Sequence, residues 1–165
     1  MNPIDPILME MSHEAATTRR LLERLPAQHL TWKPHEKSMT MGRLATHIAE
    51  IPGWVSTILD QDGFDIGASN YTPQTAGSVT EILAMFDKNL AVAETAIRRQ
   101  TMDRLSDTWR ITKRGQVIVE MPRMGVIRSL LLNHLIHHRG QLSVYLRLKD
   151  VPLPSIYGPT ADTPM

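Results

Sequence analysis

The sequence predicts an all-α fold, a four-helix bundle with a small β-hairpin before its last helix. Apolar residues recur at three- and four-residue spacings in four long segments, as in helices with one buried face. Connectors rich in proline, glycine and other turn residues separate these segments. Apolar and polar residues alternate between Trp109 and Met121, which is the pattern of strands. Four amphipathic helices bury their apolar faces by packing against one another.

Capping and breaking residues bound the first two predicted helices. The first helix covers residues 6–25 and ends before Pro26, which cannot continue it. The second covers residues 40–58, and Thr40 is a residue type that caps helix N-termini. The Pro52-Gly53 pair lies inside this helix, so we expect a bend or an interruption there.

Turn residues and a capping box bound the later elements. Residues 60–77, DQDGFDIGASNYTPQTAG, are expected to form a surface loop. Ser78 opens the third helix, with Glu81 in the capping-box position three residues later. The alternating segments flank a turn at residues 113–116 and predict a β-hairpin. The fourth helix is expected over residues 122–149, before a proline-rich tail.

Length and composition exclude several classes of function. A chain of 165 residues with 42% hydrophobic residues predicts a single domain over 1–165. Eighteen basic residues against 17 acidic residues leave no basic field for nucleic acid. No apolar run reaches the length of a membrane span, and the N-terminal segment lacks the charge of a signal peptide. We therefore expect a cytoplasmic protein without a membrane or nucleic-acid partner.

Three histidines occupy inward positions on two of the predicted helices. His134 and His138 lie four residues apart, so their side chains point the same way from successive turns. His47 lies on the apolar stripe of the second helix. Neutral imidazoles are good ligands for divalent transition metals, and the chain has no cysteine to supply thiolate ligands. The alternative is that each histidine is only hydrogen-bonded in the core.

Three segments resemble the landmark segments of the DinB-like (DinB/YfiT) metal-binding four-helix proteins, in the same order. They are SMTMGRLATHIAEIPGW, NHLIHHRGQLSVYLR and VPLPSIYGP. The resemblance implies an up-down-down-up bundle in which a histidine triad holds a divalent ion such as zinc or nickel. In this sequence the ligands implied are His47, His134 and His138. It also implies a homodimer.

Three further residues are candidates for the site, each with a structural alternative. Glu50 follows His47 by three residues and can reach a water on the ion or the second nitrogen of a ligand. Gln141 follows His138 by three residues and can orient that ring or a substrate. Tyr157 in the tail can fold over the pocket. The alternatives are solvated positions for Glu50 and Gln141 and a packing anchor for Tyr157.

Other residues of the fourth helix are expected to have structural roles. His137 projects about 100° away from His138, which favours packing or an interface over ligation. Arg139 is expected to form an ion pair or a helix contact. Gly140 in mid-helix suggests a close helix crossing. Three apolar residues lie off the predicted core stripe and support a dimer contact: Leu132, Leu135 and Val144.

The expected site chemistry is that of an open metal centre. Three neutral ligands leave the ion its charge and a free coordination position, as in catalytic sites. Such an ion can activate water or a thiol. The resemblance implies a thiol S-transferase or a related hydrolase that acts on a small-molecule substrate, with a low-molecular-weight thiol as one candidate. The alternative is a non-catalytic metal-binding or stress-associated interaction protein that forms dimers.

Overall fold

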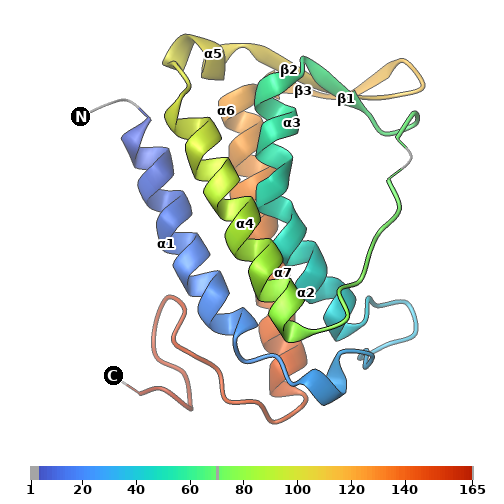
Figure 1. The fold of residues 1–165 in the computed structure, drawn as a ribbon, viewed down its shortest axis with the longest axis vertical. Coiled ribbons are helices and arrows are strands. Elements are labelled where there is room, and N and C mark those ends of the chain that lie inside the picture. Colours follow the sequence, from blue (N-terminus) through green and yellow to red (C-terminus); the bar gives the residue numbers. More distant parts are fainter. Residues whose placement is uncertain (1–3, 70, 165) are drawn as a thin grey trace.

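A computed structural model describes residues 4–69 and 71–164. In Figure 1, long helical stretches lie side by side, and a small sheet covers one end of them. The first and last stretches run in one direction, and the second and third run in the opposite direction. Their helices are α1 (Asp5–Leu22), α2 (Met41–Glu50) with α3 (Trp54–Asp60), α4 (Val79–Arg98), and α6 (Arg123–Val126) with α7 (His134–Arg147).

The second stretch is capped and interrupted where the sequence predicts. The hydroxyl of Thr40 accepts a hydrogen bond from the backbone N–H of Arg43 at 3.2 Å. The 3₁₀ turn η2 (Ile51–Gly53) separates α2 from α3, because Pro52 has no N–H to continue the α-helical ladder. This turn sets the direction in which α3 begins at Trp54. A short 3₁₀ helix, η1 (Ala27–His29), precedes this stretch.

The last stretch is not one regular helix. Between α6 and α7 the backbone forms a π-helix, η3 (Ile127–Asn133), which the apolar spacing did not predict. A π-helix has a wider turn than an α-helix and is frequently found at functional sites. The stretch ends at Arg147, close to the predicted end, and Asp150 follows with a φ of 56°.

Helix α4 begins with the predicted cap. The hydroxyl of Ser78 accepts a hydrogen bond from the backbone N–H of Glu81 at 3.2 Å. The carboxylate of Glu81 reaches back to the N–H of Gly77 at 2.9 Å, one residue before the usual capping-box position. The short helix α5 (Met102–Ser106), which follows α4, was not predicted.

The chain is mostly helical, but it contains a three-stranded sheet, so the all-α class was incomplete. Strands β2 (Thr108–Lys113) and β3 (Gln116–Pro122) form the predicted antiparallel hairpin. Arg114 and Gly115, with φ of 51° and 81°, form its two-residue turn. Strand β1 (Gly63–Asp65) pairs parallel with β2. The predicted surface loop over 60–77 therefore contains a strand; Asn70 of that loop lies outside the described residues.

Two of the three residues on which the dimer prediction rested belong to the core. Leu132 and Leu135 are buried, whereas Val144 is exposed. Leu135 is on α7, which packs against both α1 and α2, so the buried arc of α7 is wider than one apolar stripe. Leu132 is on the π-helix η3, which packs against α3 and η2. The homodimer itself stays a prediction.

The sequence suggested a close helix crossing at Gly140, but the structure has none there. The residue is exposed, and apart from its chain neighbours and its own helix backbone no described atom lies within 4 Å of the position that its Cβ would occupy.

Among the described helices, none combines the length and the apolar character that a membrane span requires.

Candidate functional site

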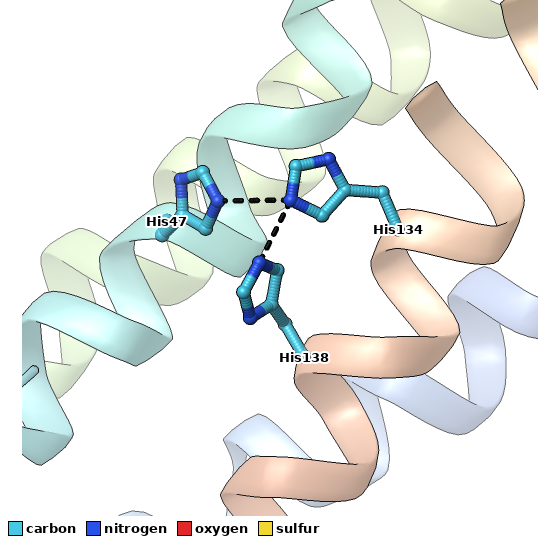
Figure 2. Close-up of side chains that lie close together, drawn as sticks. All are labelled: His47, His134 and His138. Carbon is cyan, nitrogen blue, oxygen red and sulfur yellow. Dashed lines mark hydrogen bonds between the residues drawn. The ribbon is translucent and has the colours of Figure 1, made fainter. Parts of the chain in front are cut away.

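The three predicted histidines converge between α2 and α7 (Figure 2). Nε2 of His134 lies 3.3 Å from Nε2 of His47 and 2.7 Å from Nε2 of His138. One ligand nitrogen from each ring lies within 4.8 Å of the other two. All three side chains are half-buried. The structure therefore brings together residues that are 87 positions apart in the chain.

The histidine cluster fits a divalent metal ion. Zinc binds imidazole nitrogens at about 2.0–2.1 Å in tetrahedral geometry, which puts two such nitrogens roughly 3.3 Å apart. The separation between His47 and His134 has this value, and that between His134 and His138 is shorter. Lone pairs that face one another repel, so a cation or a shared proton stabilises nitrogens held this close. The three imidazole donors equal in number the protein ligands of catalytic zinc sites.

Gln141 fixes the orientation and the tautomer of His138. Its Oε1 lies 2.7 Å from Nδ1 of His138, one turn along α7. An amide oxygen only accepts, so Nδ1 carries the proton of the neutral ring and Nε2 keeps its lone pair. That lone pair is on the nitrogen nearest His134. The contact with Gln141 thus leaves the Nε2 lone pair of His138 facing the other two histidines.

A polar network lies behind His47. Oε2 of Glu50 accepts hydrogen bonds from Arg43 at 2.8 Å and from the hydroxyl of Tyr71 at 2.9 Å. The same oxygen lies 3.6 Å from Nδ1 of His47, which is beyond hydrogen-bond distance. Nδ1 of His47 is buried and has no hydrogen-bond partner among the described residues. A small movement of the His47 ring towards Glu50 would give this nitrogen a hydrogen-bond partner.

The indole of Trp54 forms an apolar wall beside the histidines. Its centroid lies 5.5 Å from that of His47 and 5.3 Å from that of His134. Trp54 is the first residue of α3, directly after the 3₁₀ turn that interrupts the second helical stretch. The predicted break at Pro52 therefore helps to position this wall.

The surroundings favour neutral imidazoles. Burial, assisted by the neighbouring rings of His138, His47 and His137, lowers the pKa of His134 to about 4. Burial is also the largest cause that lowers the pKa of His47 and of His138. His138 and Arg43 lower the pKa of His47 further, against the opposing charge of Glu50. Metal ligation requires the neutral ring, and these shifts supply it near neutral pH.

Tyr157 is not placed over the histidines. The tail does fold back, but the Tyr157 hydroxyl donates to Glu14 at 2.7 Å and accepts from Arg139 at 2.5 Å. Within the described part of the chain, no hydrogen bond joins Tyr157 to the three histidines. The side chain anchors the tail to α1 and α7, which is the packing role given as the alternative.

The structural role predicted for Arg139 is confirmed. Its guanidinium is buried and forms an ion pair with Glu14 of α1 at 2.7 Å. His137, two residues before Arg139, is exposed, and its ring centroid lies 4.9 Å from that of His138. His137 is therefore beside the histidine cluster without joining it.

Sequence reasoning missed two polar neighbours of the site. Arg43 precedes His47 by four residues and Glu50 by seven, so helical spacing alone puts all three on one face. This spacing could therefore have identified Arg43 from the sequence. Tyr71 reaches Glu50 from the segment after β1, and no local pattern relates it to α2.

The sequence matches the DinB family over residues 1–164. It is 28% identical over 159 residues to the uncharacterized protein YrdA of Bacillus subtilis (strain 168), covering 96% of this chain and 90% of YrdA.

Solved structures with the same fold include two DinB-like proteins. The one from Bacillus cereus ATCC 10987 has a TM-score of 0.73 and 23% identity, covering 91% of this chain and 95% of that chain. YjoA of Bacillus subtilis has a TM-score of 0.70 and 19% identity, with coverages of 92% and 97%. The mycothiol-dependent maleylpyruvate isomerase is more distant, with a TM-score of 0.53, 13% identity and coverages of 92% and 62%. These likenesses concern the fold. The family match over nearly the whole length shows that the chain belongs to the DinB family.

Proposed function

We propose that this protein binds one divalent transition ion, zinc or nickel, through Nε2 of His47, His134 and His138, and that it is a metal-dependent enzyme. The reaction type is thiol S-transfer or hydrolysis. The observation that carries the proposal is the approach of Nε2 of His134 to within 3.3 Å and 2.7 Å of the other two nitrogens. We further propose that residues 1–165 form a single domain, an up-down-down-up four-helix bundle carrying the small sheet.

The donor set favours an open site over a closed structural one. All three ligands are neutral imidazoles, and no cysteine is present in the chain to complete a structural zinc site. When bound to such a set, a divalent ion retains its charge, lowers the pKa of a coordinated water or thiol, and polarises a carbonyl.

The residues around the triad orient it. Gln141 holds the ring of His138 through Nδ1, and Glu50 faces the Nδ1 of His47. Carboxylate or amide partners of this kind fix the tautomer and raise the basicity of a ligand imidazole. Arg43 and Tyr71 hold the Glu50 carboxylate in place, so we assign it a positioning role towards His47.

The thiol branch of the proposal has one support. The absence of cysteine is compatible with both branches and means only that any thiol that reacts at the site must belong to a substrate. One protein with the same fold is a maleylpyruvate isomerase that depends on mycothiol, a low-molecular-weight thiol. Hydrolysis needs only water and the same donor set.

Elemental analysis of the purified protein tests metal binding. We expect about one zinc or nickel ion per chain, and loss of that ion in the triple variant H47A/H134A/H138A. The matched control is His137→Ala, which removes an exposed imidazole next to the cluster and should keep the metal. Unchanged metal content in a folded triple variant would contradict the ligand assignment.

An activity panel on the metal-loaded protein tests the enzyme class. Low-molecular-weight thiols are paired with soluble electrophiles for transfer, and esters and amides are supplied for hydrolysis. We expect turnover in one arm that exceeds the free-ion background and disappears in His134→Ala. A loaded protein without turnover in any arm supports the alternative, a non-catalytic metal-binding protein.

A further inference from the structure

A cavity of about 520 Å³ lies next to the candidate metal centre. It is bounded by α3, by β1 and β2 of the sheet, by η3, and by the segment that follows β1. None of its lining residues carries a charged group, and most are apolar or aromatic. Its volume is within the range of small-molecule sites. Its lining includes Trp54 and Thr57 of α3, Tyr71 of the segment after β1, and Trp109 of β2.

Trp109, whose side chain lines the cavity, carries a buried donor that lacks an acceptor. Trp109 of β2 is 2% exposed, and its Nε1–H makes no hydrogen bond to any residue that the structure describes. Buried polar groups in native proteins nearly always have partners, because an unsatisfied donor costs about 1–3 kcal/mol. An indole N–H can only donate, so the missing partner is an acceptor.

The cavity shares residues with the site. Trp54 lines the cavity, and its ring centroid lies 5.5 Å from that of His47 and 5.3 Å from that of His134. Tyr71 also lines the cavity, and its hydroxyl donates to Glu50, the carboxylate behind His47. A molecule in the cavity therefore lies against the same indole as two of the three metal-ligand candidates.

We propose that this cavity binds the substrate, and that the substrate carries an uncharged apolar or aromatic group with an oxygen acceptor for the Nε1–H of Trp109. The apolar walls disfavour a charged group, because the structure provides no counter-charge among the lining residues. The assignment of the occupant as substrate rests on the proposed function; the binding of the apolar group does not. The reacting end of the molecule extends past Trp54 towards the histidines.

A matched pair of probes tests the acceptor. 2-Acetylnaphthalene and 2-ethylnaphthalene have similar shapes, but only the first has a carbonyl oxygen. Binding to the protein as purified and after metal loading is measured by equilibrium dialysis. We expect Trp109→Phe, which keeps an aromatic ring and removes the N–H, to weaken the acetyl probe by roughly three- to tenfold. The ethyl probe should bind this variant as it binds the unchanged protein. An equal effect on both probes overturns the role of the N–H.

A filling substitution tests the cavity. Thr57 is a half-buried residue of α3 that lines it, so Thr57→Phe should weaken both probes by at least about tenfold. Val92→Phe places the same ring on an exposed position of α4 and should change neither affinity. Circular dichroism and thermal unfolding confirm that each variant is folded. Unchanged probe binding in folded Thr57→Phe overturns the proposal.

Metal content, measured in the same samples, separates this inference from the proposed function. We expect Thr57→Phe to keep its ion while losing the probes. Probe binding in a protein that takes up no zinc or nickel refutes the metal centre and leaves the cavity as a binding site. Metal uptake without probe binding refutes the cavity and leaves the metal centre.

Discussion

Nδ1 of His138 lies 2.7 Å from Oε1 of Gln141, on the side of the ring opposite the histidine cluster. This hydrogen bond leaves the Nε2 lone pair free for a cation. Gln141→Ala removes the partner, so metal affinity should fall by about ten- to a hundredfold, as for other residues that hold a ligand imidazole. Competition with a chromophoric chelator measures it. Gln141→Glu, which keeps an acceptor, should retain the affinity. Equal affinities for all three proteins would refute the orienting role.

Glu50→Ala should also weaken metal binding, by roughly tenfold or more. The carboxylate lies 3.6 Å from Nδ1 of His47, and its removal leaves Arg43 as an unpaired positive charge beside the metal ligands. The same chelator competition measures the change. Glu36→Ala, at a carboxylate whose side chain is 93% exposed, is the control and should bind metal normally. A folded Glu50→Ala with unchanged affinity would show that Glu50 is only a surface contact of Arg43.

The metal-free protein should lose stability as pH falls from about 6.5 to about 4. In this window the unfolded chain binds a proton at His134 that the folded protein resists, since burial lowers the folded pKa to about 4. More protons bound to the unfolded state mean a smaller free energy of unfolding at lower pH. Urea titrations at several pH values should show this decline.

His134→Gln provides the comparison for that pH series. Glutamine does not titrate, so the variant should lose less stability over the same window. Some decline should remain, because the pKa values of His47 and His138 are also lowered. Parallel pH profiles for the two proteins would mean that His134 does not resist protonation.

Arg139→Met should destabilise the fold by about 3–5 kcal/mol, because it leaves the buried carboxylate of Glu14 without its ion pair. Chemical denaturation measures the loss, and the folded variant should bind metal as before. Arg128→Met is a matched control, since Arg128 also pairs with α1, through Glu10, but is about half exposed. It should cost no more than about 1 kcal/mol. Similar losses in the free energy of unfolding for the two variants would show that burial does not make the Arg139 ion pair more important for stability.

The histidine triad was predictable because its signal is local and periodic. His134 and His138 are one turn apart on one helix, and His47 lies on the apolar stripe of another. Helical spacing fixes where such side chains point once a helix is recognised. Gln141 was found for the same reason, since it is three residues from His138 and contacts it. The start of α4 and the hairpin turn also depend on residues within a few positions of each other.

Features that join distant segments were not predictable in the same way. Strand β1 forms because Gly63–Asp65 pairs with Arg110–Thr112, more than 40 residues later, and its three residues show no clear alternation. Tyr71 and Trp109 meet at one cavity only after that pairing. Tyr157 contacts Glu14 and Arg139, and nothing in a proline-rich tail shows beforehand which helices it will contact.

The π-helix before His134 has the register of an α-helix that has gained one residue. Deleting a residue within Ile127–Asn133 would restore the α-helical register and turn the earlier part of the stretch by about 100° relative to His134 and His138. Arg123, whose guanidinium bonds to Asp62 near β1, would then be turned away from it, while the spacing of the two histidines would not change. The π-helix thus sets how the end of this stretch that carries Arg123 is aligned with the end that carries the two histidines.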